Sequence, residues 1–524
     1  MKLSGNKNKV IESSDALLLS RRQILKASVA AGAFAMGAPI PSFSAVRKGG
    51  RLVIGTTGGS AGDSLDPTKL TSVGHGMIGY TLGNGLTEIE ADGELVGELA
   101  ESWEASADAR TWRFNLRQGV TFHNGKPMTS ADVIYSINLH RSEDSTSGAK
   151  GLLGNITDIS ADGSNAIVVS LSSGNADLPF LMGDFHLLVV PEGTTDFSKG
   201  IFTGPYMLQE FVPGERLVAK RNPNYWKADR AHADEVEILI IDDTTSRISA
   251  LMSGEVHIAG RVDPQSAGLI NSTPGVHVEN HPAAGHRPLL MQADKAPFNS
   301  NDLRLAVKYS LNREEILDKV MAGFGSIGND HPIPPFDPFH ASDIPQRQYD
   351  PDKARFYLKQ SGFTGTLELH TSNTTFAGAE AMAALFQQSA KDGGLDVKII
   401  REPADGFWGR VWMKYPFVSG AWGGRPTADI MLTTAYSSAA KWNDTAWRRP
   451  AFDQLLEQAR AETDQEKRRV LYHDMQLMIH EDGGAAIPFF VNNVDGVRDE
   501  VKGFYPAGSF ELSGMRVAER VWFA

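Results

Sequence analysis

The sequence contains no cysteine among its 524 residues. This absence excludes disulfide bonds, thiol catalysis and thiolate metal sites. It also excludes an N-terminal lipid attached to cysteine, so an exported form is expected to be free rather than lipid-anchored. Long apolar runs are missing as well: beyond residue 46, no stretch reaches the roughly 18 uncharged apolar residues of a membrane-spanning helix. The sequence therefore predicts no membrane span.

Positive charge is scarce. The chain has 51 Lys and Arg against 63 Asp and Glu, a formal net charge of −12. Residues 1–46 carry six basic and two acidic residues, so the rest of the chain is near −16. This balance favours solubility and argues against a nucleic acid or an anionic membrane as partner. The length suffices for two or three domains of roughly 100–200 residues each.

The basic residues near the N-terminus form a recognisable pattern. Arg21 and Arg22 precede the segment 27–38, in which every residue is small or apolar, and small residues follow at 42–45. A charged segment, a short apolar segment and a small-residue exit are typical of an export signal. The arginine pair and the weakly apolar core resemble a twin-arginine signal. We expect residues 1–45 to be a signal peptide that directs the folded protein through the twin-arginine translocase to the periplasm. The alternative is a basic, alanine-rich and disordered N-terminus.

Strand and helix patterns alternate along the rest of the chain, which favours an α/β fold. Alternation or β-branched content predicts strands at 51–56, 110–116, 235–241 and 396–400. Capping signals predict helices after 129–132, 312–315 and 463–466. The last of these helices is predicted to bury Val470, Leu471, Met475 and Met478.

A series of separated motifs is similar to one family over nearly the whole chain after the signal. They lie at 99–103, 112–125, 204–206, 220–226, 296–298, 303–314, 349–354 and 487–490. Their order and spacing resemble the dipeptide- and oligopeptide-binding proteins of bacterial ABC importers, extracellular solute-binding family 5. Most of these motifs are expected to be scaffold: Gly204–Pro205, for example, constrains the backbone.

The resemblance implies a two-lobed α/β binding protein, a Venus flytrap with an extra subdomain inserted in the first lobe. It implies lobe one at 47–80, 202–283 and 492–524, the insert at 81–201, and lobe two at 284–491. The ligand would be enclosed between the lobes by hinge closure. The resemblance also implies a membrane permease of an ABC importer as partner.

The resemblance further implies a ligand contact in lobe two, where peptide-binding members carry Trp-x-x-Asp. The aspartate of that motif pairs with the α-ammonium group of the peptide. In this chain Trp422 is present, but Arg425 stands at the acidic position. A guanidinium repels an ammonium and offers paired donors to a carboxylate or phosphate. The departure predicts an anionic ligand: a modified peptide, an opine-like sugar–amino-acid conjugate or a phosphorylated sugar.

Alternatives remain open at this site. Arg425 could turn away and pair with Asp429 or another acid, and in a shifted alignment Asp429 could take the ammonium. Trp408 and Trp422 could stack on a ligand or fill the core. His286 and Arg287 follow the expected crossing into lobe two, where family members often contact ligand, so both are candidate ligand-binding residues.

The sequence shows no catalytic constellation, so a binding protein is expected rather than an enzyme. His281 and His286 lack an H-E-x-x-H partner, and neither a metal nor a cofactor is predicted. The expected state is a monomer. A periplasmic chaperone or hydrolase is the alternative from another functional class.

Overall fold

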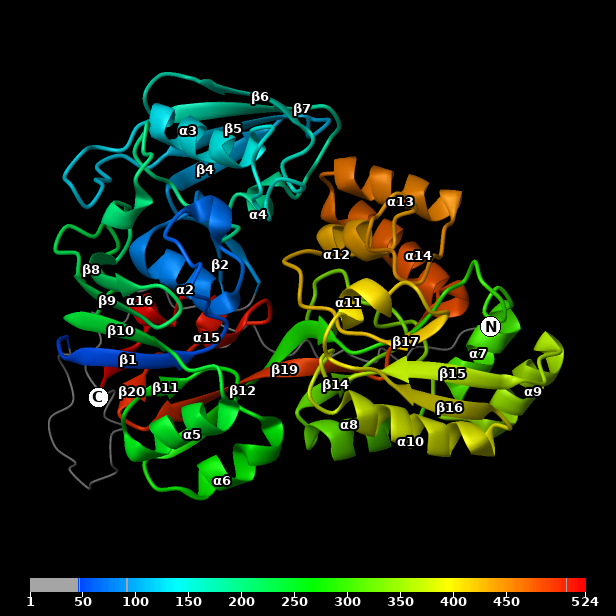
Figure 1. The fold of residues 1–524 in the computed structure, drawn as a ribbon. Coiled ribbons are helices and arrows are strands. Elements are labelled where there is room, and N and C mark those ends of the chain that lie inside the picture. The colour runs from blue at the N-terminus through cyan, green and yellow to red at the C-terminus, as the bar shows by residue number, and fades with distance from the viewer. Residues whose placement is uncertain (1–45, 47, 91–92, 506) are drawn as a thin grey trace, which may run out of the picture. The chain divides into compact units, whose positions relative to one another are not determined.

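The computed structural model describes residues 46, 48–90, 93–505 and 507–524, and residues 46–524 form one compact unit. The predicted signal peptide lies outside the described residues. Three large sheets organise this unit (Figure 1). No helix in the described part is long and apolar enough for a bilayer.

An eight-stranded sheet has the order β12-β19-β11-β1-β10-β9-β8, with β14 paired to β19. Its central strand β1 lies parallel to β10 and β11 and is buried over five of its six residues, as a strand covered on both faces must be. Helices α2, α5, α6, α15 and α16 belong to this region. The strands are β1 (Arg51–Thr56), β8 (Tyr206–Val212), β9 (Arg216–Arg221), β10 (Glu235–Ile240), β11 (Ile258–Ala259), β12 (Val276–His286), β14 (Gly325–Ile327) and β19 (Phe489–Arg498); the helices are α2 (Val73–Leu82), α5 (Thr244–Ser253), α6 (Ala267–Ser272), α15 (Glu511–Gly514) and α16 (Val517–Arg520).

A four-stranded antiparallel sheet has the order β4-β5-β7-β6 and is covered by helix α3. Strand β5 alternates buried and partly exposed side chains, so one face packs on the helix and the other faces outward. The short hairpin β2–β3 and helix α4 lie beside this part. The elements are β2 (Thr87–Ile89), β3 (Leu95–Gly97), β4 (Ala100–Ala105), β5 (Thr111–Leu116), α3 (Ser130–Arg141), β6 (Ile156–Ala161), β7 (Ala166–Leu171) and α4 (Leu178–Leu181).

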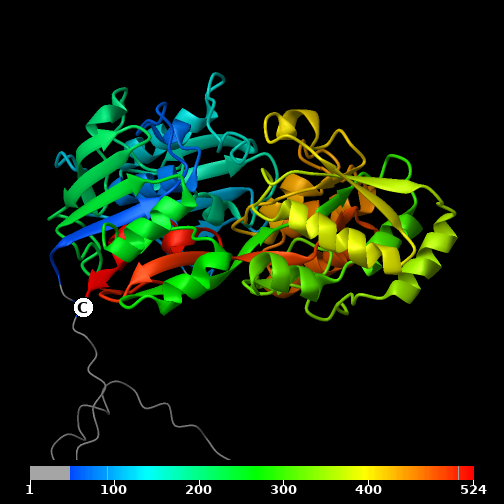
Figure 2. The same cartoon turned by 60° about the horizontal axis from the view of Figure 1, so that its bottom comes forward.

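A five-stranded sheet has the order β16-β15-β17-β13-β18, and α8 and α10 pack beside it (Figures 1 and 2). A second apolar cluster joins α12, α13 and α14. The elements are β13 (Leu289–Met291), α7 (Asn301–Tyr309), α8 (Arg313–Met321), α9 (Pro351–Ser361), β15 (Thr366–Thr371), α10 (Ala379–Asp392), β16 (Asp396–Arg401), α11 (Phe407–Arg410), β17 (Phe417–Ser419), α12 (Ala428–Ala435), α13 (Pro450–Ala461), α14 (Gln465–Asp482) and β18 (Ala485–Ala486). The chain ends with the small pair β20 (Val501–Lys502) and β21 (Trp522–Phe523).

Two adjacent strands carry the chain between the eight-stranded and the five-stranded sheet. The chain leaves the first sheet through β12 and returns to it through β19 (Figure 1). These strands are antiparallel, with a register shift between Pro282 and His286. The paired strands β12 and β19 therefore connect the two sheets.

Local predictions agree with the structure except in one helix. The strand at β1 and the capped starts of α3 and α8 are confirmed. In α14 the N-cap is Asp464, and the predicted apolar face is wrong for Val470, whose side chain is 61% exposed. Tyr472 and Ile479 are buried there, because α14 turns a face rotated from the predicted one toward α13 and α7.

Candidate functional site

A cleft of about 290 Å³ is lined by segments that are far apart in the sequence. Its walls come from the ends of α2, β2 and α4, from the loops before α9 and α12, from α14, and from the segment around α15. Small-molecule sites in proteins are typically concave, largely apolar and supplied with a few polar groups. The aromatic residues in this lining are Tyr80, Phe180, Phe185, Phe336, Phe339 and Phe510, and its charged residues are Glu90, Asp177, Asp184, Asp337, Arg425, Arg468 and Arg516.

Arg425 is the one of the six sequence-predicted site residues that lines this cleft. Its Nη1 donates to the carbonyl oxygens of Gly423 and Gly424, at 3.3 and 3.1 Å. No carboxylate of the described residues lies within ion-pair distance of it. Burial lowers the pKa of Arg425, and the nearby Asp184 carboxylate opposes that change. Its guanidinium carbon lies 5.7 Å from the ring centroid of Trp422.

Trp422 anchors the loop that carries Arg425. Its backbone exchanges two hydrogen bonds of 3.0 Å with His286, an isolated bridge between the loop and the end of β12. Its indole Nε1 donates to Asp444 at 3.0 Å, and the side chain is only 6% exposed. The geometry of Trp422 therefore suits the support of Arg425. A direct role of Trp422 in stacking on ligand stays a prediction.

The other predicted residues occupy different surroundings. Asp429 is buried on α12, pairs with Arg460 at 3.2 Å and lines a second, smaller cavity of about 150 Å³. Trp408 lies on α11, is 44% exposed and packs against Trp412. The alternative in which Arg425 pairs with Asp429 is not observed, because no ion pair between them occurs among the described residues. The alternative in which Asp429 takes an ammonium group stays a prediction.

His286 and Arg287 lie at the end of β12, next to the cleft-lining Ala284. His286 is fully buried, neither of its ring nitrogens has a hydrogen-bond partner among the described atoms, and burial lowers its pKa to about 3. The Nη1 of Arg287 donates to the carbonyl oxygens of His286 and Trp422, both at 3.1 Å. Burial lowers the pKa of Arg287 to about 10. Their roles in ligand binding stay predictions.

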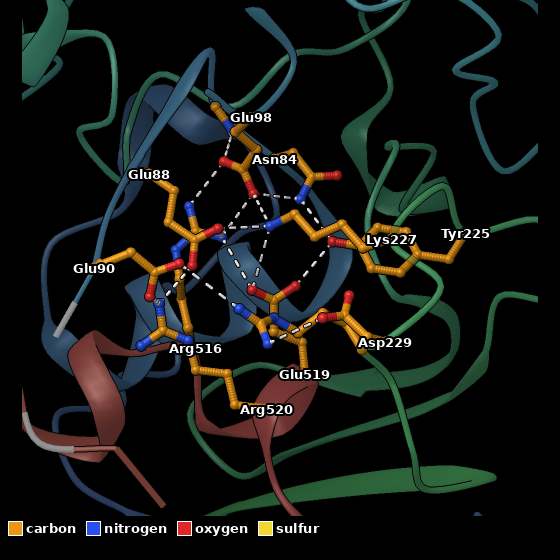
Figure 3. Close-up of polar contacts among 12 residues, drawn as sticks. Asn84, Glu88, Glu90, Glu98, Tyr225, Lys227, Asp229, Arg516, Glu519 and Arg520 are labelled. Atoms are coloured by element: carbon orange, nitrogen blue, oxygen red, sulfur yellow. Dashed lines mark hydrogen bonds and ion pairs between the residues drawn. The ribbon is translucent and has the colours of Figure 1, made fainter. Parts of the chain in front are cut away.

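A buried ion network borders the cleft at Arg516 (Figure 3). Arg516 donates to both oxygens of Glu98, at 2.7 and 2.8 Å. The Nζ of Lys227 lies 2.6 Å from Glu88, 2.9 Å from Glu98 and 3.5 Å from Glu519. These contacts tie β2 and β3 to the C-terminal segment, so the network fixes one wall of the cleft.

The three glutamates of this network are also the one group in the described residues whose carboxylates are spaced closely enough for a metal ion, with oxygens within 4.8 Å. Lys227 already faces all three. Burial alone would raise the pKa of Glu88, but Arg516, Lys227 and Arg520 outweigh it and hold that pKa well below its usual range. The three carboxylates are therefore neutralised by neighbouring basic side chains, as in a structural ion network.

Sequence reasoning missed most of the cleft. Asp337 is the clearest case: it lies in the segment 334–339, which combines three prolines with two phenylalanines and one acid. Such a segment is too rich in proline for a core strand, and this composition was the available signal. Asp184 and Arg468 gave no local signal, because each stands in an ordinary helix or turn pattern.

Comparisons with known proteins agree with the architecture. The family model described as bacterial extracellular solute-binding proteins, family 5 Middle, matches residues 94–444. The dipeptide-binding protein of Escherichia coli K12 is 25% identical over 470 residues, covering 81% of this chain and 86% of the relative.

Two solved structures have a similar fold. One is the periplasmic binding protein DppA of Helicobacter pylori in complex with the peptide STSA, with a TM-score of 0.75 and 23% identity over 91% of this chain and 98% of that one. The other is AgaA of A. tumefaciens R10 in complex with agropinic acid, with a TM-score of 0.74 and 22% identity over 91% and 99%. The predicted two-lobed α/β fold is confirmed.

Proposed function

The chain belongs to the bacterial extracellular solute-binding proteins of family 5, and on that premise we propose that its ligand is a small solute with an anionic group. The membership confirms a substrate-binding protein of the ABC-importer type, acting outside the cytoplasm, rather than an enzyme. The proposed ligands are a modified peptide, an opine-like sugar–amino-acid conjugate or a phosphorylated sugar.

One observation carries this proposal: Arg425 reaches the cleft with no acidic partner in the described structure. Its two backbone contacts leave the other guanidinium hydrogens free to donate. A desolvated guanidinium is costly unless it meets an anion, and its planar donors suit a carboxylate or a phosphate. An anionic ligand would supply the missing charge. Support also comes from the structural similarity to a protein that binds agropinic acid.

The free energy that Arg425 would contribute to ligand binding follows from the chemistry of its hydrogen bonds. Each hydrogen bond to a charged group contributes about 1.5–3 kcal/mol net. Removing one partner of a buried charge pair costs about 2–5 kcal/mol. For Arg425→Ala, this range corresponds to a loss of roughly thirtyfold or more in affinity.

Calorimetry with the solute retained by gently purified protein, identified first by native mass spectrometry, tests the proposal. Arg425→Ala should lose at least thirtyfold in affinity. Arg425→Asp should reject an anionic solute and gain unmodified dipeptides. The matched control is Arg401→Ala, an exposed arginine that pairs with Glu380 outside the cleft. Wild-type affinity in both Arg425 variants would show that Arg425 is scaffold.

The domain division remains part of the proposal. We propose lobe one at 47–80, 202–283 and 492–524, the insert at 81–201, and lobe two at 284–491, with closure about β12 and β19. Residues 1–45 would direct export of the folded protein by the twin-arginine translocase. The exported monomer would then hand its solute to a membrane permease.

A further inference from the structure

Asp184 lines the cleft together with Arg425, and its charge acts on that guanidinium without a direct ion pair. The Asp184 carboxylate is instead engaged by His186, two positions along the chain. Its Oδ1 accepts from the backbone N–H of His186 at 3.0 Å and lies 2.6 Å from the ring Nδ1 of the same residue. The charge that Asp184 presents to the cleft therefore depends on the protonation of His186.

The contacts of His186 fix how many protons the pair holds. Its Nε2 lies 2.9 Å from the carbonyl oxygen of Leu70, and a carbonyl can only accept, so Nε2 carries a proton. Its Nδ1 faces an Asp184 oxygen, and an ionised carboxylate can only accept as well. Both hydrogen bonds form together only when the pair holds one proton more than a neutral histidine and an ionised aspartate. With that shared proton, the pair of His186 and Asp184 has no net charge.

The His186 ring is enclosed on two sides. It is buried and stacks on the cleft-lining Phe185, with 4.0 Å between the ring centroids. On another side the backbone at Gly148 approaches so closely that a Cβ there would lie 2.9 Å from the His186 Nε2. The ring therefore has little room to rotate away from Asp184, and the protonation of the pair cannot be bypassed by a new contact.

The ionisable neighbours of the pair keep one charge state near neutral pH. From α3, His140 faces the ring of His186. Burial lowers the pKa of His140 to about 4, and the positive charge of His186 adds to this effect, while Asp184 and Asp66 oppose it. From α2, Tyr80 faces Asp184, and burial raises the pKa of Tyr80 well above its usual range. His140 is therefore neutral and Tyr80 protonated around pH 7, so neither masks a change at the pair.

We propose that His186 sets the affinity of the cleft for an anion, through the charge of Asp184 beside Arg425. While the pair of His186 and Asp184 holds its shared proton, Arg425 presents an uncompensated positive charge to the solute. When that proton leaves, the pair carries one negative charge, which weakens the attraction of an anion to Arg425. His186 is thus a specificity-determining residue that acts through Asp184. The inference rests on the proposed function, because it requires an anion at Arg425.

The proposal gives the pH dependence of binding a definite sign. The affinity for a carboxylate should fall as pH rises from about 6 to about 8.5, the range in which a histidine loses its proton. Couplings between two sites are typically about 5–150-fold, so we expect a loss of about fivefold or more. The effect is reciprocal: a bound carboxylate should keep the proton on His186 to a higher pH.

Calorimetry across this pH range with N-acetyl-trialanine and agropinic acid tests the coupling, because both probes remain ionised carboxylates throughout. Asp184→Asn removes the charge and keeps the side-chain oxygen that accepts from the His186 N–H. At every pH it should bind the probes as tightly as wild type does at about pH 6. His186→Gln cannot neutralise Asp184, so at every pH it should bind them as weakly as wild type does at about pH 8.5. A purely structural role of the pair would instead weaken binding in both variants.

Nitrogen-15 NMR of the histidine rings tests the pair without any solute. The His186 signals are identified by their loss in His186→Gln. At about pH 6.5, both ring nitrogens of His186 should be protonated in wild type. In Asp184→Asn the ring should be neutral with its proton on Nε2, because the Leu70 carbonyl still accepts there. In Arg425→Ala, His186 should keep its second proton to a higher pH than in wild type, since a nearby positive charge is removed.

His277→Gln is the matched control. Both ring nitrogens of His277 also face carboxylates, Asp499 at 2.9 Å and Glu279 at 3.2 Å, and none of the three residues lines the cleft. This variant should keep the affinity and the pH profile of wild type.

The outcomes separate this inference from the proposed function. If Arg425→Ala weakens both probes while Asp184→Asn and His186→Gln keep the wild-type pH profile, the inference is overturned and the proposed function stands. If Arg425→Ala binds the probes like wild type, the proposed function itself fails. If neither probe gives heat, the NMR titration decides: a shift of the His186 titration in Arg425→Ala supports the coupling, and an unchanged titration overturns it.

Discussion

Replacing Lys227 with methionine tests whether the buried ion network stabilises the cleft wall. Methionine keeps much of the length and apolar volume of lysine but removes the ammonium. The ammonium lies 2.6 Å from Glu88, 2.9 Å from Glu98 and 3.5 Å from Glu519. The substitution therefore leaves three buried carboxylates with two arginines, Arg516 and Arg520.

The expected loss of stability is large. Breaking a buried pair by removing one partner costs about 3–5 kcal/mol, and the remaining arginines place this case near the lower end. The pH dependence has a definite sign. The pKa of Glu88 is held low in the folded protein, so its contribution is present above the unfolded pKa and is lost as pH falls through the folded pKa. In Lys227→Met the folded pKa of Glu88 rises, so the deficit seen at pH 7.5 should shrink as pH falls through that raised pKa.

Calorimetric and denaturant unfolding at pH 7.5 and 4.5 measure this effect. Lys319→Met is the control, because Lys319 is exposed and makes only an i,i+4 pair with Glu315. That variant should lose about 0.3–0.5 kcal/mol. The reasoning is refuted if Lys227→Met is as stable as the control at pH 7.5, or if its deficit is the same at both pH values.

Three further predictions concern export, closure and pH. The double variant Arg21→Lys with Arg22→Lys should leave the precursor in the cytoplasm, as measured by immunoblotting of cell fractions. Normal secretion of this variant would contradict the twin-arginine prediction. Small-angle scattering at saturating ligand should show a smaller radius of gyration than ligand-free protein, since closure brings the lobes together; an unchanged radius would contradict hinge closure. Asp444 accepts from the indoles of Trp412 and Trp422 through the same oxygen, and burial raises its pKa to about 7. Because the fold favours the protonated acid, the free energy of unfolding of the wild type should decrease as pH rises from about 4 to about 7. Asp444→Asn should lose that part of the pH dependence in thermal unfolding, and an unchanged pH profile would show that Asp444 stays ionised.

The sequence by itself determined the local elements and the family. Strand β1 and the capped helices α3 and α8 depend on the order of apolar residues and on caps within four positions, and such signals survive without knowledge of the rest of the chain. The motifs at 99–125 and 204–226 likewise belong to turns and packed strands. The sequence also singled out Arg425, because a positive charge stands where the Trp-x-x-Asp motif has an acid.

Only the tertiary structure decided which charges are compensated. Arg516 and Glu98 are 418 positions apart, and no local pattern relates them. The same holds for Arg425 and Asp337, which line one cleft because the loops before α12 and α9 meet there. The exposure of Val470 is a smaller example, since the apolar face of α14 depends on how that helix packs on its neighbours. Whether a buried charge has a partner is a property of contacts distant in sequence, and folding alone creates those contacts.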